Sequence, residues 1–120
     1  MKGLTELILN RMVEYSVQLD RVFQSFADST RRDILQRVTR TELSISELAE
    51  KYSMSFAATS KHIKILESAL LITKTRKGRE QLISANPKAI KAAYDYVDQY
   101  KSLWEQRFAA IDKLLMTGQK

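Results

Sequence analysis

Apolar residues recur at helical spacing through the first third of the chain. Near the N-terminus they lie three or four residues apart, at Leu4, Leu7, Ile8, Met12 and Tyr15. This spacing predicts an amphipathic helix over about residues 3–15, within an extra N-terminal helical segment over residues 1–16. A second apolar series over residues 19–26 stops at the polar run 28–30, whose side chains are typical helix N-caps. A third helix is expected to begin there.

The next segment has the pattern of two short helices joined by a turn. Ser44 and Glu47 stand at the spacing of a capping box, which predicts a helix over about 45–52. After a polar turn, a second helix is predicted to run to Leu70. Its expected inward residues are Thr59, Ile63, Leu66 and Leu70, and its expected outward residues are Ala57, Lys61, Lys64 and Ser68. This arrangement predicts a helix-turn-helix over residues 44–70.

From Leu71 the apolar period changes from helical to alternating. The alternation, interrupted by Lys77-Gly78, predicts a β-hairpin over residues 71–85 with a basic tip. Asn86 and Pro87 then form a favourable helix start. The apolar series that follows continues to Leu115. It predicts one helix over residues 87–116, about 43 Å long at roughly 1.5 Å per residue.

Composition places these elements in one domain and locates the charge. The chain has 120 residues, 44% of them hydrophobic, with three Gly and one Pro, which suits a single compact domain over residues 1–120. Its net charge is +6, and residues 51–80 carry seven basic and two acidic groups. Most of the excess therefore lies on the second helix of the pair and on the hairpin, where a polyanion is expected to bind.

Several functional classes are disfavoured. The chain has no Cys, which excludes disulfides, thiolate metal sites and cysteine nucleophiles. With one His, no Gly-rich phosphate loop and no nucleophile beside a base, it is not expected to be an enzyme or to need a cofactor. Apolar runs do not exceed four residues, so neither a membrane span nor a secretion signal is predicted. We expect a cytoplasmic protein.

Together these elements predict a fold that is mainly α with a small β-hairpin wing, a winged helix-turn-helix. The second helix would enter the major groove of DNA, where Lys61 and Lys64 reach phosphates or guanine edges. The hairpin tip, Arg76 to Arg79, would add phosphate or minor-groove contacts, with Gly78 closing the turn. A solvated, functionally neutral basic face is the alternative, and the adjacent basic hairpin argues against it.

The terminal helices are expected to form a dimer interface, because a small domain cannot cover a helix of that length. The predicted interface residues are Leu4, Leu7, Ile8, Met12, Tyr94, Val97, Tyr100, Trp104, Phe108 and Ile111. Dimerisation would place two recognition helices about one DNA turn, roughly 34 Å, apart. A small-ligand pocket lined by the Tyr and Trp residues is an open alternative.

Three segments carry a resemblance to the ArsR-type winged-helix repressors of prokaryotes. They are residues 26–35 (Phe-Ala-Asp-Ser-Thr-Arg-Arg-Asp-Ile-Leu), residues 46–49 (Ser-Glu-Leu-Ala) and residues 54–67, and the resemblance extends over residues 19–115. It implies a homodimer that binds double-stranded DNA at a palindromic operator and represses, most like small members that regulate their own operon. The complete predicted DNA interface is Ser44, Ser55, Ala57, Thr59, Ser60, Lys61, His62, Lys64, Arg76, Lys77, Gly78 and Arg79.

Departures from the family pattern argue against metal sensing. One metal-sensing branch reads Glu-Leu-Cys-Val-Cys-Asp-Leu where this chain has Ser44 and Ser46 at the two thiolate positions. Another uses His and carboxylates on the last helix, where Asp95 and Asp98 have no His partner. No metal ligands are therefore predicted. The family also commonly has Gly at the position of Leu70, so the left-handed turn there must form differently.

The sequence leaves open the role of His62 and the choice between three functions. His62 borders the buried face, which favours a packed, hydrogen-bonded ring over a base-reading residue, although a phosphate contact is also possible from there. The function has alternatives too. These are a winged-helix dimer that binds protein or RNA, and a repressor released by a small ligand in an aromatic pocket. The sequence identifies no inducer.

Overall fold

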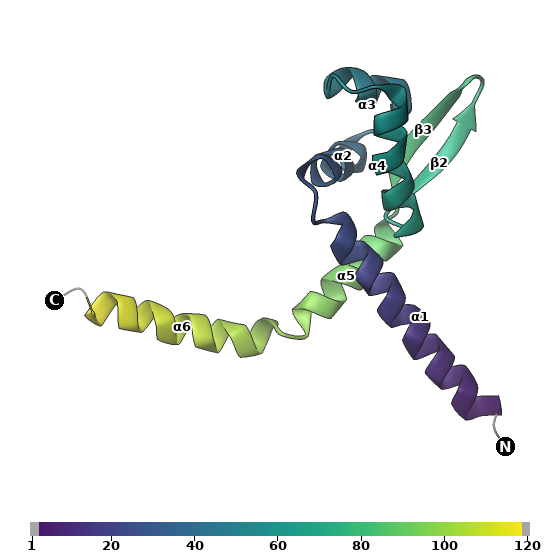
Figure 1. The fold of residues 1–120 in the computed structure, drawn as a ribbon. Coiled ribbons are helices and arrows are strands. Elements are labelled where there is room, and N and C mark those ends of the chain that lie inside the picture. Colours follow the sequence, from purple (N-terminus) through teal and green to yellow (C-terminus); the bar gives the residue numbers. More distant parts are fainter. Residues whose placement is uncertain (1–2, 119–120) are drawn as a thin grey trace. The chain divides into compact units, whose positions relative to one another are not determined.

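The computed structural model describes residues 3–118 and divides the chain into two compact units, Met1–Ala89 and Ile90–Lys120. Residues 1–2 and 119–120, which belong to the predicted ranges 1–16 and 1–120, lie outside the described residues. The elements in order are α1 (Gly3–Ser25), α2 (Ser29–Arg40), β1 (Leu43–Ser44), α3 (Ile45–Lys51), α4 (Phe56–Ser68), β2 (Ile72–Lys77), β3 (Glu80–Ala85), α5 (Pro87–Asp98) and α6 (Lys101–Thr117) (Figure 1). The predicted mainly helical fold with a small sheet is confirmed.

The N-terminal helix is longer than predicted. One helix, α1, covers the two apolar series that were expected to form separate helices on either side of about residue 16. No Gly or Pro lies between Gly3 and Ser25, so nothing in this stretch stops helix propagation. Leu19 and Val22 near its end are buried, whereas residues 3–17 are exposed along their whole length. Only the last part of α1 therefore contributes to the core.

The core of the first unit lies between α2, α3, α4 and the sheet. Its buried apolar residues are Leu19, Val22, Ile34, Leu35, Val38, Leu43, Ile45, Leu48, Ala49, Ile63, Leu66, Ala69, Leu71, Ile72 and Ile83. Asp28 caps α2, with its side chain accepting from the Arg31 amide. This core fixes the orientation of the helix pair α3–α4 against the β-hairpin.

The end of α4 differs from the prediction at Leu70. This residue was expected to point inward, but its side chain is 53% exposed and its φ is +60°. The Leu71 amide donates to the Leu66 carbonyl and the Leu70 amide donates to the Glu67 carbonyl, which together form a Schellman motif. Leu70 thus makes the left-handed turn that Gly usually makes. Leu71 is buried in its place.

A three-stranded antiparallel sheet in the order β1-β3-β2 forms the wing and its support. In β2–β3 the pairs run from Ile72↔Ala85 to Lys77↔Glu80, as the predicted hairpin requires. Gly78 begins the two-residue turn at φ +62°, a conformation that favours Gly. The short strand β1 was not predicted, and it anchors the start of α3 by pairing Leu43 with Ile83.

The C-terminal segment is two helices and not the single helix predicted over 87–116. Helix α5 ends at Asp98, and α6 begins at Lys101. The Tyr100 amide donates to the Val97 carbonyl, three residues back, so the last turn of α5 tightens and α-helical hydrogen bonding is interrupted. Neither Gly nor Pro lies near the interruption, which is why the apolar spacing did not reveal it. The predicted start at Asn86-Pro87 is confirmed, with the Lys88 amide donating to Asn86 Oδ1 at 3.3 Å.

Candidate nucleic-acid interface

A capping box fixes the start of α3. The Glu47 amide donates to Ser44 Oγ at 3.1 Å, and the Ser44 amide donates to Glu47 Oε1 at 3.0 Å. Hydrogen bonding to the carboxylate, chiefly from the Ser44 amide and then from the Ser44 side chain, lowers the pKa of the Glu47 carboxyl. The Ser44 side chain is buried and fully engaged. Its hydroxyl belongs to the helix cap, which disfavours the predicted contact of this side chain with DNA.

Two further hydroxyl groups hold the start of α4. Ser55 is the N-cap, and its Oγ accepts from the Ala58 amide at 3.0 Å. Thr59 is completely buried, and its Oγ1 donates to the Ser55 carbonyl at 3.0 Å. Thr59 was predicted both on the inward side and in the DNA interface. The inward position is confirmed, and it disfavours a DNA contact because the side chain faces the core.

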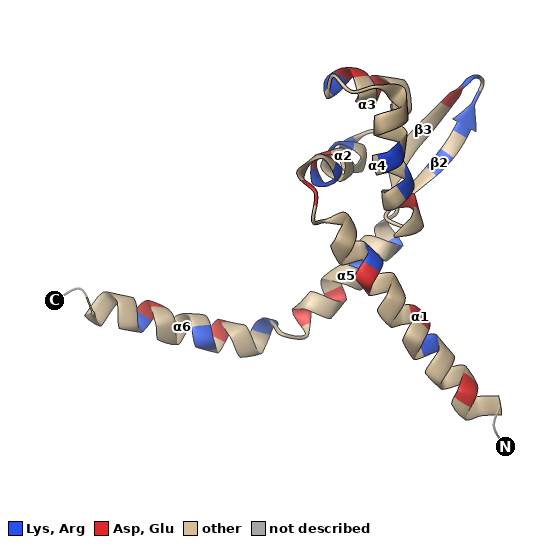
Figure 2. Cartoon of the chain, viewed as in Figure 1, with Lys and Arg blue, Asp and Glu red and all other residues tan. Residues whose placement is uncertain are grey.

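Apart from His62, which packs against α2, the remaining predicted residues form one largely exposed basic surface, which we call the α4–wing surface. On α4, Ala57, Lys61 and Lys64 are exposed and Ser60 is half-buried. At the hairpin tip the exposed residues are Arg76, Lys77, Gly78 and Arg79. Figure 2 shows the Lys and Arg residues of this surface on α4 and along β2 to the tip of the hairpin. The helix and the wing therefore present their cations as parts of the same unit.

An ion pair joins the middle of the wing to α4. Lys74 Nζ on β2 lies 3.3 Å from Glu67 Oε1 on α4. Because both groups are partly exposed, the pair adds little stability. It nevertheless identifies the side of α4 that faces the hairpin. Sequence reasoning did not anticipate this contact, since the two residues lie on separate elements.

A groove opens between the wing and the start of both helices of the pair. It has a volume of about 280 Å³, and its lining residues are Ser44, Ile45, Ser46, Phe56, Arg76, Arg79, Glu80 and Gln81. Phe56, the first residue of α4, is 57% exposed beside these polar groups. Sequence reasoning missed this residue. Its spacing gave no signal of exposure, because Phe56 precedes Thr59 by three residues and so continues the predicted inward series.

A polar cluster joins α2 to the end of α3. The Tyr52 hydroxyl donates to Asp33 Oδ2, and Arg37 Nε donates to the same oxygen at 2.8 Å. The Arg37 guanidinium also lies over the Tyr52 ring, 5.7 Å from its centroid. The hydrogen bonds from Tyr52 and then Arg37 lower the pKa of Asp33, and burial together with the bond to Asp33 raises the pKa of Tyr52 to about 12. This cluster holds α3, and through the short turn α4, against α2.

His62 packs beside the cap of α2. Its side chain is 20% exposed, and its Nδ1 lies 3.7 Å from Asp28 Oδ2. Nδ1 is buried and makes no hydrogen bond with the described residues. The packed position expected for His62 is confirmed, but the expected hydrogen bond is absent from the described part of the chain. The pKa of Asp28 is lowered, mainly by the Arg31 amide that it accepts from.

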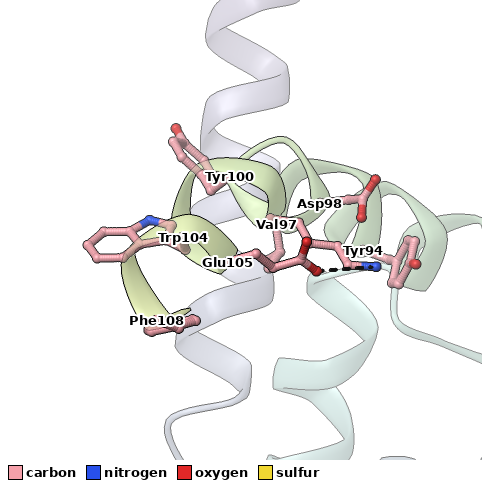
Figure 3. Close-up of a pocket in the computed structure, with 8 residues that line it drawn as sticks. Tyr94, Val97, Asp98, Tyr100, Trp104, Glu105 and Phe108 are labelled. Carbon is pink, nitrogen blue, oxygen red and sulfur yellow. Dashed lines mark ion pairs between the residues drawn. The ribbon is translucent and has the colours of Figure 1, made fainter. Parts of the chain in front are cut away.

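The residues predicted for a dimer interface are exposed in each of the two units. On α1 they are Leu4, Leu7, Ile8 and Met12, accompanied by Leu9, Val13 and Val17, which were not predicted. On α5 and α6 they are Tyr94, Val97, Tyr100, Trp104, Phe108 and Ile111, accompanied by Leu103, Leu114 and Leu115. The Trp104 and Phe108 rings stack with centroids 5.9 Å apart and project on the same side of α6 (Figure 3). They help to line a hollow of about 680 Å³ on the second unit.

Within the described residues, 3–118, no group of three or more His, Asp or Glu side chains is arranged to hold a metal ion. None of the helices formed by those residues is both long and apolar enough to cross a membrane.

The geometry defines a winged helix-turn-helix protein, and comparisons with known proteins agree. Residues 26–75 match a family model described as a helix-turn-helix domain. The HTH-type transcriptional regulator Rv2034 of Mycobacterium tuberculosis is 32% identical over 81 residues, which are 68% of this chain and 76% of that protein. The crystal structure of an ArsR family transcriptional regulator has a TM-score of 0.68 and 32% identity, covering 75% of this chain and 93% of the other.

A third relative is known in solution. It is the homodimeric winged helix-turn-helix DNA-binding domain, fragment 1–100, of Mb0332 from Mycobacterium bovis, described as a possible ArsR-family regulator. Its TM-score is 0.62 at 23% identity, covering 78% of this chain and 88% of that fragment, which shows a shared fold. The chain belongs to the helix-turn-helix transcriptional regulators of the ArsR type. The resemblance noted in the sequence is thereby confirmed.

Proposed function

We propose that this protein is a homodimeric, sequence-specific DNA-binding regulator that represses its own operon. The observation that carries the proposal is the α4–wing surface. Lys61, Lys64, Lys77 and Arg79 are all exposed there, and none of them forms an ion pair with the described residues 3–118. A continuous set of unpaired cations on a helix and an adjacent hairpin is suited to a phosphate backbone.

Helix α4 is the proposed recognition element. An α-helix fits the major groove, and the small side chains of Ala57 and Ser60 allow its backbone to approach the base edges. Lys61 and Lys64 project from the same side and are suited to phosphates or guanine edges. The hairpin tip would contact the neighbouring backbone. Ser44 and Thr59 have no direct part, since both side chains are internal.

The exposed apolar surfaces of α1 and of α5–α6 support the proposed homodimer. An apolar band that covers successive turns of a helix is unfavourable in water and usually marks an interface. A second copy of this chain carries the same bands and can cover both. Two-fold symmetry would then place two α4 helices about one DNA turn, roughly 34 Å, apart and would require a palindromic operator. The Mb0332 fragment, which has a similar fold, is described as homodimeric and so supports the proposed homodimer.

Repression is proposed to act through occupation of the operator. The described elements supply a DNA-binding surface and apolar surfaces for self-association, and a bound dimer over a promoter excludes RNA polymerase. Metal-independent regulation is proposed because serines stand at both thiolate positions. Such a regulator would act in the cytoplasm. Zinc, cadmium or arsenite should leave operator affinity unchanged, and release by any of them at stoichiometric amounts would contradict this part of the proposal.

A DNA-binding measurement tests the proposal and separates it from protein or RNA binding. A promoter fragment from upstream of its own gene should be bound in the presence of excess competitor DNA. The logarithm of the association constant should fall with the logarithm of salt concentration, with a slope of about −0.9 per neutralised phosphate. Loss of all binding upon addition of competitor DNA would reject specific operator recognition.

The hollow on the second unit favours a second candidate, a repressor released by a small ligand. Aromatic rings line much of it, including Tyr94, Tyr100, Trp104 and Phe108. In the dimer proposal, side chains of the second copy fill this hollow. A compound that quenches the fluorescence of Trp104, the chain's one Trp, and also releases operator DNA would support the ligand-responsive form.

A further inference from the structure

Phe56 is an exposed aromatic residue within a basic surface. Its side chain is 57% exposed, although Phe is usually buried. It lines the groove together with Arg76 and Arg79 of the wing. The other large exposed apolar groups of α1, α5 and α6 form long bands on helices, whereas Phe56 stands at the end of the helix proposed to read DNA. Its exposure therefore calls for a partner different from the one that covers those bands.

The position of Phe56 on α4 points it towards the wing side of the interface. Residues 56, 60, 63 and 67 follow one another at spacings of four, three and four, so they lie along one side of the helix. Glu67 on this side pairs with Lys74 of β2 at 3.3 Å. Phe56 lies on the same side of α4, three turns before Glu67. There it is next to Arg76 and Arg79, near the exposed end of the hairpin. Farther along this side Ile63 is buried, so Phe56 is its exposed end, in the groove that Arg76 and Arg79 also line.

The surrounding charge selects the chemistry of the partner. A second copy of the chain would bring the same arginines and lysines against this surface, which like-charge repulsion disfavours. The partner must supply negative charge beside an apolar group. The major groove of DNA does so, since phosphates flank it and each thymine presents a C5-methyl group, a known partner for Phe. RNA lacks this methyl group, because uracil replaces thymine.

We propose that Phe56 reads a thymine in each half of the operator by packing its ring on the C5-methyl group, while Arg76 and Arg79 hold the adjacent phosphates. The inference rests on the proposed DNA-binding function and adds a base preference to it. Burial of one methyl group contributes about fourfold in affinity. Removal of that methyl from both half-sites should therefore weaken binding by about sixteenfold if the half-sites act independently.

The test removes single methyl groups from the DNA. Wild-type protein is first used to select operators from a random-sequence DNA pool, and a thymine is expected at one fixed position in each half-site. The dissociation constant is then measured by fluorescence anisotropy for the selected duplex and for duplexes in which one thymine at a time is replaced by deoxyuridine. Deoxyuridine pairs identically with adenine and lacks only the methyl group, so the ratio of the two constants isolates that group.

Three proteins are compared on these duplexes. Wild type should bind about fourfold more weakly when deoxyuridine replaces the fixed thymine. Phe56→Ala should show a ratio near one, because the ring that senses the methyl is gone. Lys61→Ala is the matched control. It should bind both duplexes more weakly but keep the wild-type ratio, since a phosphate contact carries no base information. Circular dichroism verifies the fold of each variant.

The results separate this inference from the proposed function. A ratio near one for wild type at every thymine would overturn the role of Phe56, as would a wild-type ratio retained by Phe56→Ala. Selected operators without a fixed thymine would overturn it as well. Failure of wild type to enrich any sequence would instead reject the DNA-binding proposal itself. A thymine preference lost only in Phe56→Ala would establish the contact.

Discussion

The Tyr52 hydroxyl donates a hydrogen bond to Asp33 Oδ2 and so links the end of α3 to α2, nineteen positions earlier in the chain. Arg37 donates to the same carboxylate, which therefore receives two donors. Both helices of the helix-turn-helix depend on this contact, because α4 follows α3 after only four residues. The cluster fixes the direction of α4 without taking part in the proposed DNA surface.

Tyr52→Phe should therefore lower the free energy of unfolding while leaving the helices in place. We expect a loss of about 1 kcal/mol at neutral pH, a value moderated by the partial exposure of the cluster. The pKa of Tyr52 is raised to about 12. The contribution of its hydrogen bond to the free energy of unfolding is therefore present below pH 10 and is lost as pH rises from 10 through 12. Because the pKa of Asp33 is lowered, the same stabilising contribution is also lost as pH falls below about 4.

Two measurements check this cluster. The free energies of unfolding of wild type and Tyr52→Phe, measured with urea, should differ most between about pH 4 and pH 10. The difference should become smaller at more acidic and more alkaline pH. In addition, the tyrosinate absorbance of wild type minus that of Tyr52→Phe should rise with a midpoint near pH 12. Equal stability of the two proteins at neutral pH, or a midpoint near 10, would contradict the described contact.

Ser44→Ala should destabilise the protein through the lost cap of α3. The substitution removes the acceptor for the Glu47 amide, and loss of such a cap costs about 1 kcal/mol. Ser46→Ala, at an exposed position in the first turn of the same helix, is the matched control and should change stability by less than about 0.5 kcal/mol. Operator affinity of folded Ser44→Ala should remain near wild type. A large specific loss of affinity at wild-type stability would restore the DNA-reading role expected from sequence.

Leu70→Gly should stabilise the protein. The left-handed conformation at φ +60° costs a non-Gly residue about 1 kcal/mol, and the Leu70 side chain is 53% exposed, so its loss removes little packing. Leu70→Ala is the control, since it removes the side chain but keeps the backbone strain. Thermal unfolding should place Leu70→Gly above Leu70→Ala by about 1 kcal/mol. If the two variants unfold at the same temperature, the backbone at Leu70 is not strained.

Local chemistry allowed much of the fold to be predicted from sequence. The capping box of Ser44, the start of α5 at Pro87 and the hairpin turn at Gly78 each depend on residues within a few positions, and all three are confirmed. The interruption near Tyr100 was not predictable in this way, because it involves neither Gly nor Pro. Strand β1 was missed for a related reason, since two residues are too few for a periodic signal.

The exposed basic part of the candidate site could be predicted from the sequence, because helical and hairpin spacing indicates which side chains face solvent. Lys61, Lys64 and the hairpin tip are exposed as expected. The burial of Ser44 and Thr59 was not foreseen for a DNA interface, because residue type alone does not show whether a hydroxyl bonds to the backbone. Phe56 was missed, since an aromatic residue near a helix start is ordinarily assigned to the core. Its exposure emerges only when the wing and both helices are placed together.

Trp104→Glu should convert the proposed dimer into monomers. The substitution places a charge in the aromatic band of α6, where its burial against a second copy would be costly. Gln106→Glu adds the same charge to α6 at a position outside the predicted interface and is the matched control. Sedimentation velocity should show a dimer for wild type and the control, and a monomer for Trp104→Glu. A persistent dimer in that variant would place the interface on other residues.

Hydroxyl-radical footprinting upstream of its own gene tests the central claim most directly. Wild type should protect two symmetric patches whose centres lie about 10 base pairs apart, one for each α4 helix of a dimer. Lys61→Ala combined with Lys64→Ala should lose this protection while its circular dichroism spectrum stays native. An unprotected upstream region, or protection that is unchanged in the double variant, would contradict DNA recognition by the α4–wing surface.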